Sequence, residues 1–387
     1  MSHVRHSSLS CAMRRLRPGG MRPPRGPAIL PPVEWDRRQA RVDCKKHAEM
    51  NAQLNARQQI MDDLDRRIVG ALLASPRASN AQISEVVFTS EATVSRRVAR
   101  LIAQGTVRVI GVLDGEATRR TRSLFVRLRC RPGAAHRSAE RLAAWPECGS
   151  VKLLTGSVEC VAEINYTSNE HLLAITLEQL PALDGVLAVW SNQVIRRFAT
   201  PHSWLPALLP DELVEQLRAQ RLDPWHDPLP DRPATTDALD ERIAAALAQD
   251  GRLGWQRLAE LCDASPVTVR RHAESLMLSG ALRMRTVVEP ERIGLPVSAF
   301  VSLNVNPTQL GRAGELIAEH PSVLMISATT GDRNLCGEVA LESDAALYAF
   351  ISDTIGGLPG LQHADVAVAL QSVKRAGRIV AAAAPAT

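Results

Sequence analysis

Apolar side chains in residues 90–105 recur at the spacing of a helix, and this stretch is the clearest local pattern in the chain. Val94, Val98 and Leu101 stand three or four positions apart, which predicts one buried stripe along a helix. Ser90 precedes the stripe and is a preferred N-cap residue, because its hydroxyl can accept from an unpaired backbone N–H of the first turn. A glycine follows the stripe and suits the left-handed conformation in which many helices end. The pattern therefore predicts a short amphipathic helix.

The remaining faces of this helix carry hydroxyl and guanidinium groups. Arginine can bind guanine through two hydrogen bonds, and hydroxyls can contact either bases or phosphates. We therefore predict a recognition helix, whose candidate DNA contacts are Ser90, Thr93, Ser95, Arg96, Arg97 and Arg100. All three arginines are expected to be exposed. The alternative is a solvated amphipathic helix whose polar face has no ligand.

Two shorter helical patterns precede the predicted recognition helix. Residues 62–74 place acids in the first turn, where the helix dipole favours them, and carry an apolar stripe. Residues 79–87 predict a second short helix joined closely to the third, as in a helix-turn-helix. Residues 106–114 alternate in polarity and predict a short strand or wing. Residues 61–113 are therefore predicted to form a winged helix-turn-helix domain.

The whole pattern occurs twice. Residues 62–195 align with residues 237–370 at a constant offset of 175, without a gap. A second winged helix-turn-helix is predicted at residues 236–288, with candidate DNA contacts at Ser265, Thr268, Arg270, Arg271 and His272. Because Glu274 and Ser275 stand where the first copy has alanine and arginine, the alternative is a degenerate second unit with a structural role.

A segment with a different pattern of apolar and polar residues follows each predicted helix-turn-helix. Strand, helix, strand, strand, helix and strand patterns follow one another in residues 114–198 and again in residues 289–375. This order is typical of a ferredoxin-like domain. Gly156 and Gly331 fall at the turn between the two middle strands. The predicted fold class is therefore α+β: two winged helix-turn-helix domains, each followed by a βαββαβ ferredoxin-like domain, in a covalent tandem repeat.

The other segments are biased in composition. Residues 199–235 are predicted to be a proline-rich, semi-rigid linker with one short helix. Residues 376–387 are predicted to be a flexible tail, and residues 1–60 a disordered extension rich in arginine and proline. That extension is either a basic arm that adds affinity for phosphates or an untranslated segment before a start at Met50 or Met61.

Charge and motifs narrow the classes of function. The net charge is +5, but residues 1–60 hold twelve Lys and Arg against four Asp and Glu, so the folded part has no basic excess. The seven cysteines are scattered and form no C-x-x-C motif, which predicts reduced thiols in a cytoplasmic protein. No apolar run is long enough to span a membrane, and no hydrolase, metalloprotease or P-loop motif occurs. We predict no catalytic residue, metal site, cofactor or membrane partner.

A helix-turn-helix that opens with Leu-Asp-Arg-Arg-Ile, followed by a βαββαβ domain with a Gly-x-x-acid turn, resembles the Lrp/AsnC family of transcription regulators. Members of that family carry one such module and dimerise through the βαββαβ domain, so this chain resembles two members joined covalently. The resemblance implies double-stranded DNA as a partner, self-association through the ferredoxin-like domains, and a small-molecule effector such as an amino acid near the Gly-x-x-acid turn. The candidate effector residues are Gly156, Ser157, Glu159, Gly331, Asp332 and Asn334; the first copy lacks the acid of Asp332.

Two other functions are alternatives. The tandem architecture also resembles the siroheme decarboxylases, in which paired ferredoxin-like domains hold a tetrapyrrole. Such an enzyme needs histidine and arginine around that cavity, and the candidates here are His136, His171, His320 and His363. The second alternative is a ligand-sensing or scaffold protein that does not bind DNA.

The tandem repeat leads to three expectations about assembly and DNA. The two ferredoxin-like domains are expected to pair within the chain, which directs two recognition helices to successive major grooves, about 34 Å apart. Because the two helices differ in sequence, the DNA site is expected to consist of two unlike half-sites. The first helix is expected to contribute more affinity than the second, because it has one more arginine and lacks an acid at the position of Glu274.

Overall fold

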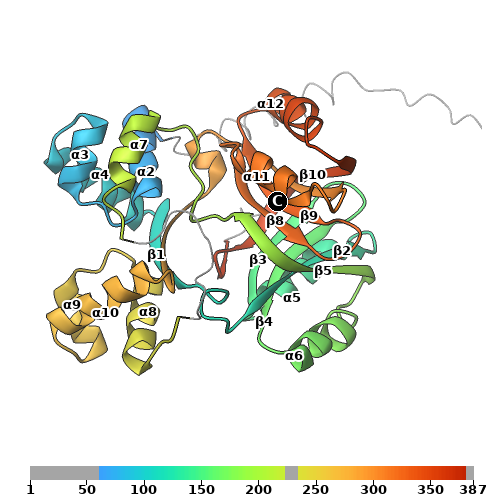
Figure 1. The fold of residues 1–387 in the computed structure, drawn as a ribbon, viewed down its shortest axis with the longest axis horizontal. Helices are drawn as coiled ribbons and strands as arrows, with labels where there is room; N and C mark the ends of the chain where they lie inside the picture. The colour runs from blue at the N-terminus through green and yellow to red at the C-terminus, as the bar shows by residue number, and fades with distance from the viewer. Residues whose placement is uncertain (1–60, 223–233, 381–387) are drawn as a thin grey trace, which may run out of the picture. The chain divides into compact units, whose positions relative to one another are not determined.

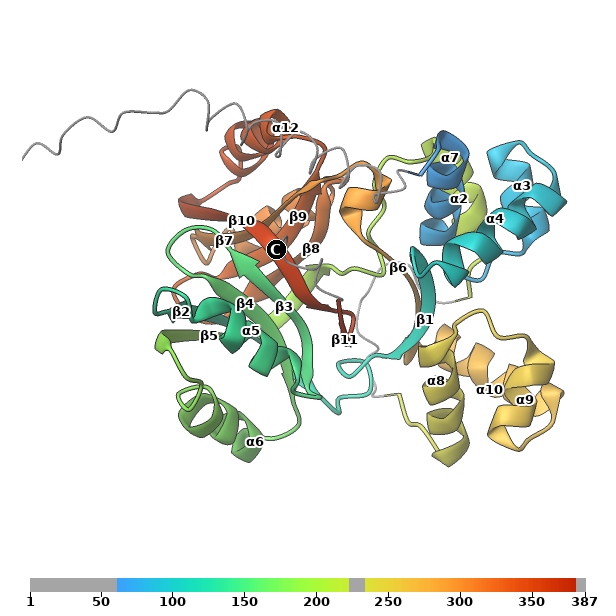
Figure 2. The same ribbon diagram turned by 180° about the vertical axis from the view of Figure 1, so that it is seen from behind.

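The computed structural model describes residues 61–222 and 234–380. The predicted N-terminal extension, the central part of the predicted linker and the last residues of the tail lie outside these ranges. Within them, each half of the chain supplies three helices, a strand, and then a βαββαβ unit (Figures 1 and 2). Among the described residues, no helix has the length and apolar character needed to cross a membrane.

The first three-helix unit consists of α2 (Asp63–Ala74), α3 (Asn80–Val87) and α4 (Glu91–Ala103). Each helix begins at a polar cap, since a side-chain oxygen of Asp62, Ser79 or Ser90 accepts the backbone N–H three residues later. The predicted apolar stripes are confirmed, because one core buries Ile68, Leu72, Ile83, Val86, Val94, Val98 and Leu101. The sequence pattern alone is sufficient to predict the three helices of this unit and their buried faces.

The second three-helix unit repeats the first with different side chains. It consists of α8 (Ala238–Gln249), α9 (Trp255–Cys262) and α10 (Pro266–Leu278). Asp237 caps α8 by accepting the Asp240 N–H, and its own N–H donates to the Asp240 carboxylate. Ser265 caps α10 just before Pro266. Its core is separate from that of the first unit and buries Ile243, Leu247, Leu258, Val269 and Leu276.

The strand after each three-helix unit pairs with its counterpart in the other half of the chain. Strands β1 (Val107–Leu113) and β6 (Leu282–Val288) form a two-stranded antiparallel ribbon, with Ile110 opposite Arg285. Figure 1 shows this ribbon between the two helical units, and β1 contacts both α4 and α8. The predicted short strand is therefore confirmed in each half, but it forms no wing within its own unit, because the strand of the other half pairs with its N–H and C=O groups.

Each half contributes a four-stranded antiparallel sheet of ferredoxin-like topology. The first sheet contains β2 (Arg122–Cys130), β3 (Cys148–Leu154), β4 (Cys160–Tyr166) and β5 (Val186–Ala199) in the order β3-β4-β2-β5. The second contains β7 (Val297–Val305), β8 (Val323–Thr329), β9 (Leu335–Leu341) and β10 (Leu361–Arg375) in the order β8-β9-β7-β10. A short strand, β11 (Arg378–Ile379), pairs with the end of β10.

The last strand of each sheet is long enough to join the other sheet. Strand β5 pairs with β2 and then, from Val194 onward, with β8. Strand β10 pairs with β7 and then, from Ala369 onward, with β3. The eight strands thus close into a ring of antiparallel pairs. On the face away from the helices, Phe125 and its repeat equivalent Phe300 meet edge to face, with ring centroids 5.9 Å apart.

Helices cover the other face of each sheet. Helices α5 (Ala135–Ala143) and α6 (Asn169–Leu173) pack on the first sheet, and α11 (Leu310–Ala318) and α12 (Asp344–Ala349) pack on the second (Figure 1). Two helices that the sequence pattern presents as continuous change their hydrogen bonding: α6 continues as a π-helical turn at Ala174–Gln179, and α12 does so at Phe350–Ile355. A 3₁₀ turn at Pro290–Ile293 follows β6.

Most of the predicted linker that the structure describes is folded onto the first three-helix unit. Helix α7 (Asp211–Arg218) contacts α2, and the side chains of Trp204, Leu209 and Leu217 are buried in the core of that unit. A Cβ on Gly70 of α2 would lie 2.9 Å from the Cβ of Leu208, so a glycine is needed for this close approach. The short helix predicted in residues 199–235 is therefore confirmed as α7, and it packs against the first three-helix unit.

The cap of α2 leads to a testable prediction. Asp62→Ala is expected to cost about 1 kcal/mol of stability, as loss of an N-cap does. The hydrogen bond from Arg97, followed by that from the Asp65 N–H, holds the pKa of Asp62 below its ordinary value of 3.8. A carboxyl with a lowered pKa stabilises the fold above its unfolded pKa, and this contribution is lost as the pH falls through the folded pKa.

The measurement is thermal unfolding of wild type and Asp62→Ala between pH 2 and pH 7, with the difference expected to shrink as the pH falls below 3.8. Asp62→Asn is the matched control, because asparagine keeps the cap and removes the charge. A difference that stays constant across this range would contradict the argument.

Candidate nucleic-acid interface and effector site

The polar face of α4 carries one unpaired arginine and two that are bound within the protein. Arg96 is exposed and has no hydrogen bond or ion pair in the part of the chain that the structure describes. Arg97 donates to Asp62 and, at 2.9 Å, to Asp65, which leaves 23% of its side chain exposed. Arg100 donates to the second carboxylate oxygen of Asp65. The expectation that all three arginines are exposed is therefore confirmed for Arg96 and Arg100 and wrong for Arg97, which is half-buried.

These ion pairs fasten α4 to the first turn of α2. Asp65 is only 3% exposed, and a buried carboxylate requires a cation or hydrogen-bond donors. The hydrogen bonds that Arg97 donates to Asp62 and Asp65 raise the pKa of Arg97 above its usual value. Asp62 and Asp65, at the start of α2, therefore also orient α4.

His272 of α10 stands at the repeat position of Arg97. Its Nδ1 lies 2.8 Å from Asp240 Oδ1 and 4.0 Å from Asp237 Oδ2. Within the described residues, these three side chains bring their ligand atoms close enough together for a metal ion. Both carboxylates already accept backbone N–H groups in the capping box of α8, so hydrogen bonding to the histidine accounts for the cluster.

The two arginines of α10 differ from each other. Arg270 Nε donates to Glu274 Oε1 at 2.8 Å, so its charge is partly neutralised along the helix. Arg271 is exposed and, among the described residues, has neither a hydrogen bond nor an ion pair. Because Arg271 occupies the repeat position of Arg96, the two helices each present one unpaired cation at the same place.

The candidate hydroxyls lie at the helix starts. Ser90 Oγ accepts the N–H of Thr93 and lies 2.9 Å from its hydroxyl, and Ser265 and Thr268 form the same pair at 2.8 Å. These four residues therefore hold the first turns of α4 and α10. Ser95 is exposed on α4 beside Arg96.

The predicted effector turn of the second half binds the first half of the chain. Gly331 has a φ of +94°, which glycine adopts readily. Asp332 Oδ1 accepts from Arg127 Nη2 at 3.0 Å, and Arg127, on β2, is buried. Arg127 also donates to Asn192 Oδ1 at 3.2 Å, while the amide of Asn192 donates to the carbonyl of Thr330. The acid of this turn is therefore already paired.

Sequence reasoning missed Arg127 and Asn192. The repeat contains the signal that would have found them, because their equivalents are Ser302 and Ala367. Arg127 is buried, and the second copy has serine at its position. This difference indicates that the arginine acts at only one of the two otherwise equivalent joints between the sheets.

Two other predicted effector residues hold strands. Asn334 Oδ1 accepts the N–H of Val305 at 2.9 Å, and its amide donates back to the carbonyl of Val305 at 2.7 Å. Glu159, at the equivalent position, accepts the N–H of Cys130 at 2.8 Å. Each side chain thus fixes the end of the first strand of its own sheet.

The turn of the first half lies at the equivalent joint. Gly156 has a φ of +96°, so both glycines serve the turn as the sequence predicts. Thr155 N donates to Val368 O at 2.9 Å, and its hydroxyl accepts the Val368 N–H at 3.0 Å. Ser157 is exposed at this joint. Ser302 stands here at the position that Arg127 occupies in the other joint.

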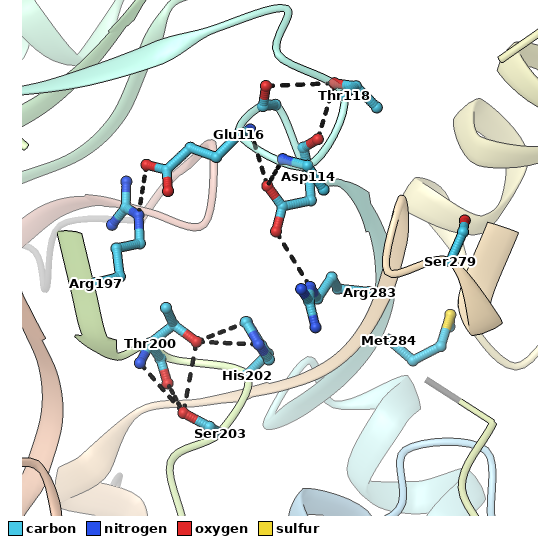
Figure 3. A network of polar contacts seen from close by, with 12 residues as sticks. Asp114, Glu116, Thr118, Arg197, Thr200, His202, Ser203, Ser279, Arg283 and Met284 are labelled. Carbon is cyan, nitrogen blue, oxygen red and sulfur yellow. Dashed lines mark hydrogen bonds and ion pairs between the residues drawn. The ribbon is translucent and has the colours of Figure 1, made fainter. Parts of the chain in front are cut away.

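A set of ion pairs connects the ribbon to the first sheet (Figure 3). Asp114, directly after β1, accepts from Arg283 of β6 at 3.1 Å. Glu116 accepts from Arg197 of β5 at 2.8 Å, and Arg197 also donates to Glu163 at 2.8 Å. Burial acts to lower the pKa of Arg197, but the two glutamates outweigh it and raise that pKa. The turn at 114–118 therefore links the strands of the helical units to the sheet.

The second half also contains an open cavity of about 640 Å³. It lies between the folded linker segment and the second sheet, and its lining includes Leu208, His320, Glu342, Phe350 and Asp353. Burial lowers the pKa of His320, whose ring meets Phe350 edge to face. None of the six predicted effector residues is among the described residues that line this cavity.

The four histidines considered for a tetrapyrrole enzyme lie on different elements. His136 pairs with Glu140 on α5, and His171 contacts Thr167 at the start of α6. His320 precedes β8, and His363 is exposed on β10. Because each histidine has different neighbours, the described residues contain no site that the four histidines share.

This fold defines a class of protein. A helix-turn-helix domain is followed by a ferredoxin-like domain of the kind that binds ligands. The AsnC-type helix-turn-helix domain matches residues 61–102, and the Lrp/AsnC ligand binding domain matches residues 123–203 and 298–379. The Bkd operon transcriptional regulator of Pseudomonas aeruginosa is 33% identical over 147 residues, which cover 36% of this chain and 94% of that protein. The chain belongs to the Lrp/AsnC family of transcription regulators.

Two further proteins are informative. HTH-type transcriptional regulator LrpA1 of Halobacterium salinarum is 30% identical over 131 residues, covering 34% of this chain and 92% of that protein. The crystal structure of the siroheme decarboxylase NirDL matches 82% of this chain and 94% of its own, with a TM-score of 0.54 and 13% identity. At this identity the likeness is one of fold, and it extends over both halves of the chain.

Proposed function

We propose that this chain is a single-chain Lrp/AsnC-type regulator in which two helix-turn-helix units bind double-stranded DNA side by side. The observation that carries the proposal is the equivalence of α4 and α10: both begin at the same Ser-Thr cap and both present an unpaired arginine, Arg96 or Arg271. The ribbon of β1 and β6 ties the two units together as the pairing of two separate subunits would.

Charge at the sheet joints supports pairing between unlike halves. Three cations of the first half, of which Arg127 and Lys152 are buried and Arg197 is half-buried, have serine at the equivalent positions of the second half: Ser302, Ser327 and Ser372. In the observed register Arg197 lies opposite Ser327, and Ser372 lies opposite Lys152. Two copies of the first half would set Arg197 against Lys152, and like charges opposite each other destabilise a sheet. Two copies of the second half would leave Glu338 without its cation.

The experiment is selection of DNA by the full chain from a random-sequence pool, followed by footprinting of the selected sites. Two unlike half-sites about 34 Å apart are expected, because α4 and α10 differ in sequence. Specific dissociation constants of about 10⁻⁸ to 10⁻¹¹ M are typical at physiological salt. Recovery of a perfect inverted repeat, or of no sequence at all, would count against the proposal.

A small-molecule effector is proposed at the turn around Gly331. The joint there contains a buried guanidinium and a carboxylate, which are the groups that recognise the two charged ends of an amino acid. Entry of a ligand requires Arg127 and Asp332 to separate, and this would change the joint between the two halves. The DNA titration repeated with a panel of amino acids tests this, and an effect that persists in Asp332→Ser would place the effector elsewhere.

A further inference from the structure

The segments that follow α2 and α8 meet where the two three-helix units come together. The last carbonyl groups of a helix have no partner within it, and a cation in the last turn often binds them. Neither α2 nor α8 has a basic residue in its last turn. The ends of both helices therefore depend on donors from outside the helix.

Each half of the chain supplies an arginine to the helix end of the other half. Arg77, after α2, donates to the carbonyl of Gly251 and, at 3.1 Å, to that of Leu253, both after α8. Arg252, the repeat equivalent of Arg77, donates back to the carbonyl of Pro76 at 2.9 Å. We call this reciprocal pair of contacts the arginine clamp.

Close contacts bring the same two helix ends against the ribbon. The N–H of Gly251 donates to the carbonyl of Val109 on β1 at 2.8 Å, and a Cβ on Gly251 would lie 2.9 Å from the backbone nitrogen of Ile110. The Thr286 hydroxyl of β6 donates to the carbonyl of Leu72 in the last turn of α2. Each helix end thus touches the strand of the other half, and the clamp joins the two ends beside the ribbon.

The clamp can fix an angle that the ribbon alone leaves variable. Two-stranded ribbons differ widely in twist and are only marginally stable by themselves. A second attachment beside the ribbon restricts rotation of one unit about it. Within the described residues neither arginine of the clamp is in an ion pair, so directional hydrogen bonds to backbone carbonyls hold them. These bonds require one arrangement of the two helix ends.

The two sides of the clamp are unequal. The guanidinium of Arg77 also lies over the ring of Trp255, 4.5 Å from its centroid, where a cation is attracted. The repeat equivalent of Trp255 is Asn80, so the residue at that position offers Arg252 no ring. Burial, followed by repulsion from Arg252, lowers the pKa of Arg77, which indicates that the two cations are close to each other. Arg77 is therefore expected to contribute more than Arg252.

We propose that the arginine clamp sets the spacing of the DNA half-sites by holding α4 and α10 at one separation and one angle. This inference rests on the proposed function, in which both helices bind one duplex. Half-sites on successive turns are about 34 Å apart, and each added base pair turns the second by about 34° around the duplex. A clamped pair of units therefore fits one spacing, whereas a pair joined by the ribbon alone can follow the second half-site.

The experiment compares binding of the full chain to the selected operator and to the same operator with four base pairs inserted between its half-sites. Linking two binding units raises affinity by about 10²–10⁴-fold only where both can bind at once. Wild type is therefore expected to bind the longer operator about 100-fold more weakly. Arg77→Met combined with Arg252→Met should bind the selected operator about 3- to 10-fold more weakly, because its units are less well oriented, and should lose less than about 10-fold on insertion.

Arg257→Met is the matched control, because Arg257 is exposed on α9 and donates to Glu260; it should keep the wild-type ratio of affinities for the two operators. Each single variant should relax the spacing partly, Arg77→Met more than Arg252→Met, and these variants serve if the double variant does not fold. An unchanged ratio in the clamp variants would overturn the proposal, because a purely stabilising role lowers binding to both operators equally.

A measurement without DNA separates the clamp from the proposed function. Ala92 and Val267 are exposed repeat equivalents in the first turns of α4 and α10. Spin labels placed there through a ketone-bearing unnatural residue report the distance between the two helices by pulsed electron resonance. Wild type should give one narrow distribution, and Arg77→Met with Arg252→Met a broader one; equal widths would overturn the clamp. Failure of wild type to bind any operator, with the narrow distribution retained, would instead refute the proposed function and the spacing derived from it.

Discussion

Glu338→Gln is expected to lower the free energy of unfolding by about 3–5 kcal/mol, because it leaves a buried ammonium group without its counter-charge. Glu338 on β9 and Lys152 on β3 come from different halves of the chain, and they are 6% and 4% exposed. Burial lowers the pKa of Lys152 well below its usual value, and its Nζ contacts the Glu338 carboxylate. Equilibrium unfolding in urea measures the loss.

Two further variants test this explanation. Replacing both partners by methionine is expected to be nearly neutral, since well-packed apolar residues often replace a buried ion pair without loss. Glu315→Gln is the control at an exposed pair with Arg196, where about 0–1 kcal/mol is expected. A loss from Glu338→Gln no larger than that of the control would show that the buried pair does not hold the two halves together.

The pH dependence of the stability of Glu338→Gln follows from the protonation of Lys152. In this variant Lys152 has a folded pKa below its unfolded value of about 10.4, so the unfolded state binds more protons between the two values. Stability of the variant should therefore rise with pH, relative to wild type, until the unfolded pKa is reached.

The helical units could be predicted from the sequence because their signals are local. The apolar spacing of Val94, Val98 and Leu101 and the caps at Ser90 and Ser265 are sufficient to place α4 and α10. The alternating strands and the two turn glycines likewise place the ferredoxin-like sheets. Local patterns of this kind depend on residues a few positions apart, which a single sequence displays.

Contacts between the halves could not be predicted in this way. The pairing of β1 with β6 and the partners of Arg97, Arg127 and Lys152 lie 32 or more residues apart in the chain. A hydrophilic side chain looks the same in sequence whether it faces solvent or a buried carboxylate. The repeat alone gave an indication, since serine stands at the positions equivalent to Arg127, Lys152 and Arg197 in the second half.

The ion pairs on α4 and α10 change which arginines are expected to bind DNA. Arg97 and Arg100 are held by α2, and Arg270 is held by Glu274, so Arg96 and Arg271 are the cations that can move to DNA without breaking an ion pair. Both are expected to matter, whereas the sequence alone favours the first helix. Loss of a base contact costs about 1–3 kcal/mol, and loss of a phosphate contact lowers the salt slope by about one.

Arg96→Ala and Arg271→Ala are each expected to weaken operator binding by about 5- to 150-fold if they contact bases. The two sites are on different helices, so the double variant should lose the product of the two factors. Titration on one selected operator at two salt concentrations separates the cases: a base contact relaxes one position of the site, and a phosphate contact weakens all sequences and reduces the slope.

Arg270→Ala is the matched control, because it removes an arginine from the same turn of α10 whose charge Glu274 already offsets. It should change affinity much less than Arg271→Ala does. Arg97→Ala should reduce stability more than DNA affinity measured on the folded fraction, since its partners Asp62 and Asp65 lie within the protein. Equal losses from Arg270→Ala and Arg271→Ala would show that the ion pairs do not decide which arginines reach the DNA.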